Sequence, residues 1–470
     1  MAAVVRWMID RFGMREVRDH VLHRRVPKDP WYQGDGEAML LLFAIQLLTG
    51  IVLAFSYTPS VVEAYNSIRH ITFEQKLGWF VRGLHYWSGG LWVFILFWHL
   101  MRQIATGGYK KPREGTWLIG VLLLFLVVVM SFLGYLLRWD ERAIYALRVA
   151  LSIFHQVPWI GEQLVLIIQG GPELSSLTLT RLYAVHVVLG PILLAVLIAY
   201  HVYLVVLHGT LASAEMKEPL ETVAEQKEVY ERQARHPYRG ERFFPDTVVR
   251  LSPIPLATLA VVIALTLAFG PAKLFPQGVG TDATFPKEEW WFAWYSALAA
   301  LLPPSVAGYF HWLFPVVLFV ALAALPFVDR WTDNRGARNR PIAVTVVCLV
   351  VLAVLYLTAL RLRSPWTAWP RKTPPAVPVG VMLTERTERG RVLFATYGCN
   401  SCHAVAGDGP EFAPDMARLR QRYSLEGIRR YVMDPPAGVA MPSYRERMPE
   451  EELTLVAEFC HVAQTFPRGR

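Results

Sequence analysis

Cysteine and charge are both scarce in this chain. Only four of its 470 residues are cysteines and 18% are charged, whereas 54% are hydrophobic. So few cysteines exclude a disulfide framework, and this balance of charged and apolar residues predicts an integral membrane protein with some polar sequence attached. The net charge of +9 does not point to nucleic acid as a partner, because no basic run outside the loops is interleaved with aromatic residues.

The beginning of the chain lacks the apolar core of a secretory signal. Residues 1–36 are rich in arginine, and their apolar residues recur at helical spacing. This pattern predicts an amphipathic segment that lies on the membrane surface, in contact with lipid.

Long apolar runs are abundant. Seven are long enough to cross a bilayer, at residues 38–57, 81–102, 117–137, 182–207, 251–272, 311–328 and 341–360. The uncharged region 290–328 is too long for one span and is broken at Pro303 and Pro304, so we expect a surface helix over 290–301 before the sixth span. Lys and Arg concentrate at the N-terminus and after the second, fourth and sixth spans. This bias predicts a cytoplasmic N-terminus and a C-terminus on the outer face. The expected location is the bacterial inner membrane, with the C-terminus on the periplasmic side.

Two of the spans carry a pair of histidines each. His85 and His99 lie fourteen residues apart, and His186 and His201 fifteen residues apart. In a helix these gaps place both members of a pair on about the same side, separated by about 21–22 Å along the axis. Two such pairs at matching depths predict two non-covalent haem b sites with bis-histidine ligation. His85 and His186 would serve the outer site, and His99 and His201 the inner one. One pair alone could equally consist of core histidines.

The composition changes after the last span. Residues 363–380 are rich in proline and predict a stiff linker, and residues 381–470 form a small soluble domain. This domain contains Cys399, Cys402 and His403 in the C-x-x-C-H pattern that attaches a covalent haem c. A redox dithiol or half of a zinc site is the alternative, but the domain has no second cysteine pair. We expect Met441, which precedes Pro442 in an irregular stretch, to be the other iron ligand, with Met448 as the next candidate.

These residues resemble cytochrome b of the quinol:cytochrome c oxidoreductases, the bc and b6f complexes. Besides the histidines, the likeness rests on Q-L-L-T-G from Gln46, K-K-P-R-E from Lys110 and L-T-L-T-R-L-Y from Leu177. The fifteen-residue histidine gap and the lack of an eighth span resemble the b6f branch, with both of its separate chains fused here. The resemblance implies an all-α protein: a four-helix haem domain over 37–250 with a cytoplasmic loop, a three-helix domain over 251–362, and the cytochrome c domain.

Four glycines accompany the histidines in the resemblance: Gly36 and Gly50 around the first span, and Gly120 and Gly134 in the third, each pair fourteen residues apart. Glycine there lets a porphyrin lie against the backbone, although helix–helix contact also favours small residues. Arg82 and Arg102 resemble the partners of the haem propionates; ordinary positive flanks of a span are the alternative. The b6f-branch cysteine that tethers an extra haem corresponds to Gly34, so no such covalent haem is expected.

The resemblance also implies an outer quinol-oxidising site. The family's Pro-Glu-Trp-Tyr motif reads Glu288-Glu289-Trp290-Trp291 here, which gives Glu289 the role of proton acceptor. Tyr135 and the segment 140–169 would complete the pocket. Leu-Pro-Trp-Asp after the third span reads Leu137-Arg138-Trp139-Asp140, a second departure from the family pattern.

The implied protein is the cytochrome b/c subunit of a quinol:cytochrome c reductase that moves electrons through two b haems and translocates protons in a Q-cycle. Its partners would be quinol and quinone, a separate Rieske iron–sulfur protein, a downstream cytochrome or oxidase, and a second copy in a homodimer. Candidate inner quinone-site groups are Asp19, His20 and His208. Two alternatives are an electron relay without its own quinol-oxidising site, serving another dehydrogenase or oxidase, and a structural anchor for the cytochrome c domain.

Overall fold

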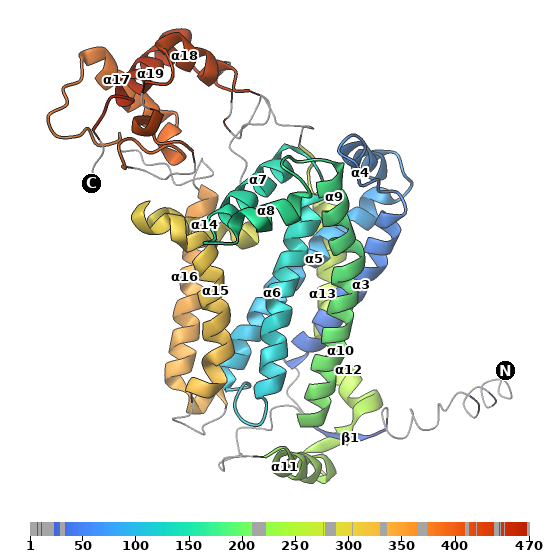
Figure 1. Ribbon diagram of the computed structural model, residues 1–470. Helices are drawn as coiled ribbons and strands as arrows, with labels where there is room; N and C mark the ends of the chain where they lie inside the picture. The colour runs from blue at the N-terminus through green and yellow to red at the C-terminus, as the bar shows by residue number, and fades with distance from the viewer. Residues whose placement is uncertain are drawn as a thin grey trace.

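The computed structural model describes residues 7, 11, 23–28, 33–208, 222–275, 277, 288–302, 304–329, 336–363, 374–408, 413–419, 421–436, 441, 443–445 and 447–467. These residues form a helical bundle followed by a small helical domain (Figure 1). The predicted N-terminal amphipathic segment, most of the proline-rich linker, and Asp19 and His20 lie outside the described residues.

Four long helical segments form the first half of the bundle. They are α3 (Asp35–Ala54), α5 (Gly78–Thr106), α6 (Glu114–Leu136) and a continuous segment made of α9 (Ser176–Tyr183), η3 (Ala184–Leu189) and α10 (Gly190–His208). Helix α3 packs against α5, and α6 packs against α10. Their shared apolar core includes Leu42, Trp92, Val127 and Leu194. The first half is therefore two helix pairs set side by side.

The segment η3 is a π-helical turn, and it contains His186. A π turn accommodates one residue more than an α turn, which compensates for the extra residue in the fifteen-residue histidine gap. Its cause lies directly after it. Pro191 cannot donate a hydrogen bond to the carbonyl four residues earlier, and its ring crowds that carbonyl, so the preceding turn widens.

Three helices form the second half. They are α13 (Pro253–Phe269), α15 (Pro304–Val328) and α16 (Pro341–Arg363), and the predicted surface helix appears as α14 (Trp290–Leu301). Helix α14 packs against α16, and α13 packs against α3 and α5. Arg340 links the two halves. Its Nη2 donates to the hydroxyl of Tyr109 in the first half at 2.7 Å and to Oδ2 of Asp329 in the second half at 2.6 Å.

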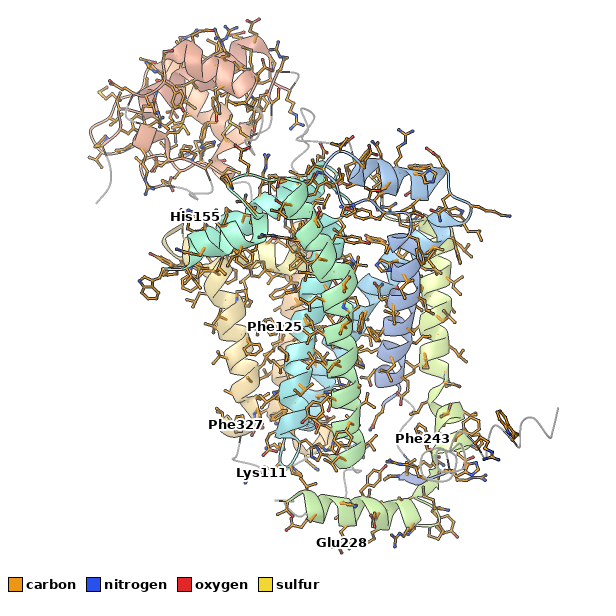
Figure 2. The ribbon with its side chains drawn as sticks, turned by 45° about the vertical axis from the view of Figure 1, so that its right-hand side comes forward. Lys111, Phe125, His155, Glu228, Phe243 and Phe327 are labelled. Carbon is orange, nitrogen blue, oxygen red and sulfur yellow. The ribbon has the colours of Figure 1, made fainter. Side chains whose placement is uncertain are left out.

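The two ends of the bundle differ. One end carries α4 (Ala64–Phe73), α7 (Glu141–His155) and α8 (Gly161–Gln169). The opposite end carries α11 (Val223–Arg235), η4 (Phe243–Thr247), α12 (Val248–Leu251), η5 (Ala337–Asn339), and β1 (Arg25–Pro27) paired antiparallel with β2 (Gly240–Arg242). Figure 2 shows His155 at the first end, and Lys111 and Glu228 at the other. The short β pair is the one departure from the predicted all-α fold among the described residues.

Among the described residues, five helices have the length and composition to cross a membrane: Asp35–Ala54, Glu114–Leu136, Ser176–His208, Tyr309–Val328 and Pro341–Arg363. A sixth is added if Phe243–Leu251 and Pro253–Phe269, bent by 46°, form one span. Helix α5 is not among them, although it has 29 residues, because its histidines, tyrosine, tryptophans and glycines lower its mean hydropathy. The protein is therefore a multi-pass membrane protein, and the count of seven spans stays a prediction.

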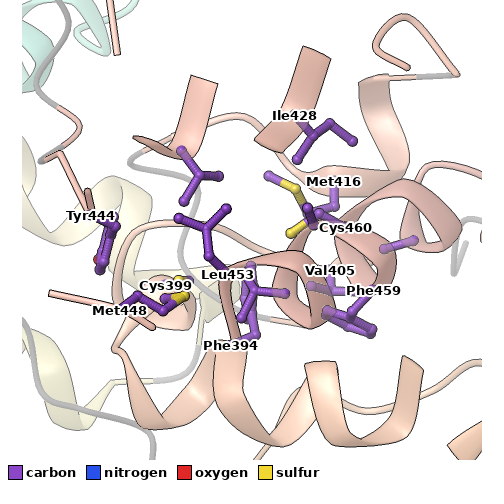
Figure 3. Packing of buried hydrophobic residues seen from close by; sticks show 14 of the residues in the cluster. Phe394, Cys399, Val405, Met416, Ile428, Tyr444, Met448, Leu453, Phe459 and Cys460 are labelled. Carbon is purple, nitrogen blue, oxygen red and sulfur yellow. The ribbon is translucent and has the colours of Figure 1, made fainter. Parts of the chain in front are cut away.

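The C-terminal domain contains α17 (Glu385–Thr396), η6 (Cys399–Ser401), η7 (Met416–Leu419), α18 (Leu425–Met433) and α19 (Glu450–Ala463). Its core joins Phe394, Cys399, Val405 and Phe459 with Met448 and further apolar side chains (Figure 3). Helices α17 and α19 cross at Gly390, where a Cβ atom would lie 2.1 Å from the Leu455 carbonyl oxygen. Only glycine allows this close crossing.

Replacing Gly390 should therefore loosen this domain. In Gly390→Ala the helices must separate, which costs about 1–3 kcal/mol as overpacking does. We expect faster protease cleavage within residues 381–470 of the full chain in detergent, with the membrane bundle cleaved at its usual rate. Arg389→Ala, at the exposed neighbouring position, is the control and should match the unaltered chain. Equal cleavage of all three proteins would contradict the prediction.

Candidate haem and quinol sites

The four span histidines lie in two pairs, as the sequence predicts. The ring centroids of His85 and His186 are 6.4 Å apart, with their planes at 81°. Two metal–nitrogen bonds of about 2 Å, with half an imidazole ring at each end, span roughly this distance. His99 and His201 are likewise neighbours. Each pair joins a histidine of α5 to one of the η3–α10 segment, across the two helix pairs.

Three of the four predicted glycines lie directly against these imidazoles. A Cβ atom would meet the Cε1 atom of the histidine at 3.3 Å for Gly50 and His85, at 3.2 Å for Gly120 and His201, and at 2.8 Å for Gly134 and His186. A Cβ atom at Gly36 would meet nothing within 4 Å. Glycine at these positions keeps open the space beside the rings that any group bound by the histidines would need.

Hydrogen bonds orient the two histidines of α5. The Thr49 hydroxyl lies 2.9 Å from Nδ1 of His85, and the Asp35 carboxylate lies 3.1 Å from Nδ1 of His99. His186 and His201 instead have backbone groups of Met130 and Thr116 as hydrogen-bonding neighbours. A neutral imidazole held through one ring nitrogen has the other ring nitrogen available for a metal ion. The residues present therefore fit haem iron.

Thr49 and Asp35 were not predicted as site residues, although a signal for them is present in the sequence. Each directly precedes a glycine of the first fourteen-residue glycine pair, so both share the register of the histidines on α5.

The two arginines predicted to hold propionates have protein partners. Arg82 is buried and donates from Nη1 to the Thr72 hydroxyl of α4 at 3.1 Å. Arg102 donates from Nε and Nη2 to the Asp35 carboxylate at 2.9 and 2.7 Å. Propionate contact stays a prediction for both. His208, a candidate for the inner quinone site, is also engaged, with Nδ1 lying 3.0 Å from the Thr116 hydroxyl.

Glu289 lies in a buried polar cluster beside the outer histidine pair. The Tyr86 hydroxyl donates to its carboxylate at 3.3 Å, and Arg138 lies 3.7 Å from its other oxygen. The Arg138 guanidinium also stacks on the Tyr135 ring, 4.2 Å from its centroid, and lies 3.6 Å from the Asp140 carboxylate. Arg138 thus brings the two predicted catalytic residues together. Burial raises the pKa of Glu289 above 4.5, and Arg138 and Tyr86 only partly offset this effect.

The predicted surface segment after α6 frames this cluster. Asp140 is fully buried and caps α7 by accepting a hydrogen bond from the backbone N–H of Ala143 at 2.9 Å. Next to Glu289, Glu288 forms two 2.7 Å hydrogen bonds with the buried Arg361 near the end of α16. Tyr86, Arg138 and Arg361 were not predicted as site residues. Two of them have a signal in the sequence: Tyr86 directly follows His85, and Arg138 departs from the family pattern.

The C-x-x-C-H residues lie together in the C-terminal domain. Cys399 and Cys402 are free thiols, and Nδ1 of His403 lies 2.8 Å from the Pro414 carbonyl oxygen, which leaves Nε2 available for iron. Met441 packs, partly buried, against the core that contains Met448. These residues fit a covalently attached haem, with the identity of the methionine ligand still a prediction.

A multi-pass helical bundle with paired buried histidines and a C-x-x-C-H domain defines a membrane-bound cytochrome. Residues 28–210 match the family "Cytochrome b/b6/petB", and residues 385–459 match "Cytochrome C oxidase, cbb3-type, subunit III". The chain is 32% identical to the "Cytochrome bc complex cytochrome b subunit" of Chlorobaculum thiosulfatiphilum, over 78% of this chain and 82% of that protein. It is 35% identical to "Cytochrome b6" of Acaryochloris marina, over 43% of this chain and 94% of that protein.

Among solved structures, a "Hyperthermophilic respiratory Complex III" chain shares the fold, with a TM-score of 0.65, 24% identity, and coverage of 77% of this chain and 92% of that chain. The chain belongs to the cytochrome b family. It is the cytochrome b of a bc/b6f-type complex, extended by a C-terminal cytochrome c domain, and these domains imply haem b and haem c.

The contact between Gly134 and His186 should control haem binding at the outer pair. In Gly134→Ala the new methyl group displaces the imidazole, so we expect about tenfold or greater weakening of haem binding at that pair, as for other disturbed ligand shells. The measurement is the haem b content per chain, recorded while the purified protein is diluted so that weakly bound haem dissociates. The control is Gly115→Ala on the same helix, where a Cβ atom meets nothing within 4 Å. A full haem complement in Gly134→Ala would count against this site.

Proposed function

We propose that this chain is the cytochrome b/c subunit of a quinol:cytochrome c reductase and oxidises quinol at its outer face. The observation that carries this proposal is the buried Tyr86–Glu289–Arg138–Tyr135 cluster beside His85. It combines a proton-accepting carboxylate, hydroxyl groups and a fixed cation in a setting that quinol, an apolar ring with two hydroxyl groups, would enter from the membrane.

The residues divide the work as follows. Glu289 accepts a proton from a quinol hydroxyl, and Arg138 stabilises the carboxylate before the proton arrives. Tyr86 orients Glu289 through its hydrogen bond, and Tyr135, held under the Arg138 guanidinium, forms one wall of the pocket. When bound, two b haems, ligated by His85 with His186 and by His99 with His201, would carry electrons across the membrane.

The same proposal covers the membrane topology, the haem c ligands and the partner proteins. The chain crosses the inner membrane seven times, with α5 as a span and with the N-terminus in the cytoplasm. Cys399, Cys402 and His403 hold haem c on the outer face, with Met441 as the remaining ligand. A Rieske protein is the immediate electron acceptor, and electrons leave through haem c to a downstream cytochrome or oxidase. Two copies of the complex form a homodimer. Quinone is reduced at the inner face, and the cycle translocates protons.

The haem inventory tests the proposal most directly. Purified full-length chain should contain two extractable b haems for each haem that stays covalently attached after acid acetone treatment. Cys399→Ser should remove covalent attachment at that sulfur and leave the b haems in place. One b haem per chain, or no covalent haem, would refute the assignment.

The raised pKa of Glu289 predicts the pH dependence of quinol oxidation. Only the ionised carboxylate accepts a proton, so the rate in the purified complex should rise with pH through a range above the ordinary value of 4.5. In Glu289→Gln the rate should fall by about a hundredfold, and this part of the pH profile should disappear. Glu173→Gln, an exposed glutamate after α8, should keep both rate and profile. An unchanged profile in Glu289→Gln would remove Glu289 from the mechanism.

A further inference from the structure

The two histidines of α5 have matched but chemically different partners on α3. His85 is bonded by the neutral hydroxyl of Thr49, whereas His99 is bonded by the carboxylate of Asp35. Thr49 and Asp35 are fourteen residues apart, as His85 and His99 are. The outer and inner pairs are therefore built on one repeated geometry, with a neutral hydroxyl at the outer histidine and a carboxylate paired with Arg102 at the inner one.

Asp35 is held firmly in place. Its side chain is only 4% exposed, and Arg102 donates hydrogen bonds from Nε and Nη2 to its two oxygens. Asp35 also sits in the first turn of α3, where the helix dipole favours a negative charge. A buried carboxylate persists only with such partners. One oxygen of the Asp35 carboxylate, Oδ2, lies within hydrogen-bond distance of both Arg102 and His99.

We propose that Asp35 is a positioning residue that lowers the reduction potential of the inner haem. Its carboxylate accepts the Nδ1–H of His99, which fixes the ring with Nε2 free for iron and makes the imidazole a more basic ligand. A more basic ligand stabilises the ferric state. Thr49 gives His85 the same orientation without the charge, so the effect is confined to the inner site. This inference rests on the proposed ligation of two b haems by the four histidines.

Redox titration of the haem b absorbance tests the inference in the full-length chain. The variants are Asp35→Asn and Asp35→Thr, of which the second copies the outer partner, and Asp35→Glu, which keeps the carboxylate. The matched control is Thr49→Val. The inner component is identified in the titration by its loss in His201→Leu.

We expect both neutral variants to raise the potential of the inner component and leave the outer one unchanged. For a one-electron couple, a tenfold change in the equilibrium constant for electron transfer between the two haems corresponds to a shift of about 59 mV in the potential difference. Asp35→Glu should stay close to the unaltered chain, and Thr49→Val should move only the outer component. Loaded neutral variants with an unchanged inner potential would overturn the inference.

The haem content of each variant distinguishes the remaining outcomes. Loss of the inner haem alone from both neutral variants, with retention in Asp35→Glu, would support the positioning of His99 by the carboxylate. Loss of both haems together from every Asp35 variant would overturn the inference, because Asp35 would then serve the fold as a whole. Fewer than two b haems in the unaltered chain would refute the proposed ligation itself, a failure that is visible before any variant is measured.

Discussion

The close approach of helix backbone to buried imidazole is the constraint on which the membrane half of this protein depends. Polar rings in an apolar bundle are costly unless each has a partner, and the rings here need open space beside them. Gly50, Gly120 and Gly134 provide that space at three of the four histidines. The pairing of α3 with α5 and of α6 with α10 follows, as does the π turn that returns His186 to the register of His201.

The outer cluster shows two departures from the family pattern that are accommodated by contacts distant in sequence. Where the family motif has proline, this chain has Glu288, and the buried Arg361 of α16 neutralises it. Where a second motif has proline, this chain has Arg138, which lies against Glu289 and Tyr135. Both replacements add a charge, and each added charge has a partner of opposite sign. Both prolines of the family pattern are thus replaced here by residues that form ion pairs.

Elements set by local pattern could be predicted from the sequence. The helix over 290–301 has the predicted bounds, because an uncharged run makes up its length and a new helix begins at Pro304. Helical geometry predicted that the four histidines form two pairs, and the rings of His85 and His186 lie 6.4 Å apart. Helix α5 was predicted as a span, but its histidines, tryptophans and glycines make it less apolar than the five helices that meet the hydropathy criterion.

What could not be predicted depends on contacts between segments far apart in the chain. The bond between Tyr86 and Glu289 joins positions 203 residues apart, and that between Arg361 and Glu288 joins positions 73 apart. No periodicity records such pairs. The β1–β2 pairing is similar, since three-residue strands carry too little pattern to be recognised. Asp35 and Thr49 form an intermediate case: their register was readable, but their role required the position of the facing imidazoles.

The ion pair between Glu288 and Arg361 also anchors the end of the membrane bundle. The last helix of the bundle, α16, ends two residues beyond Arg361, so the chain leaves the bundle from a point bonded to the loop that carries Glu289. A tethered module meets its neighbour at an effective concentration set by the linker, of about millimolar order for short linkers. Under the proposed function, haem c would therefore meet its electron donor by a local search rather than by diffusion through bulk solution.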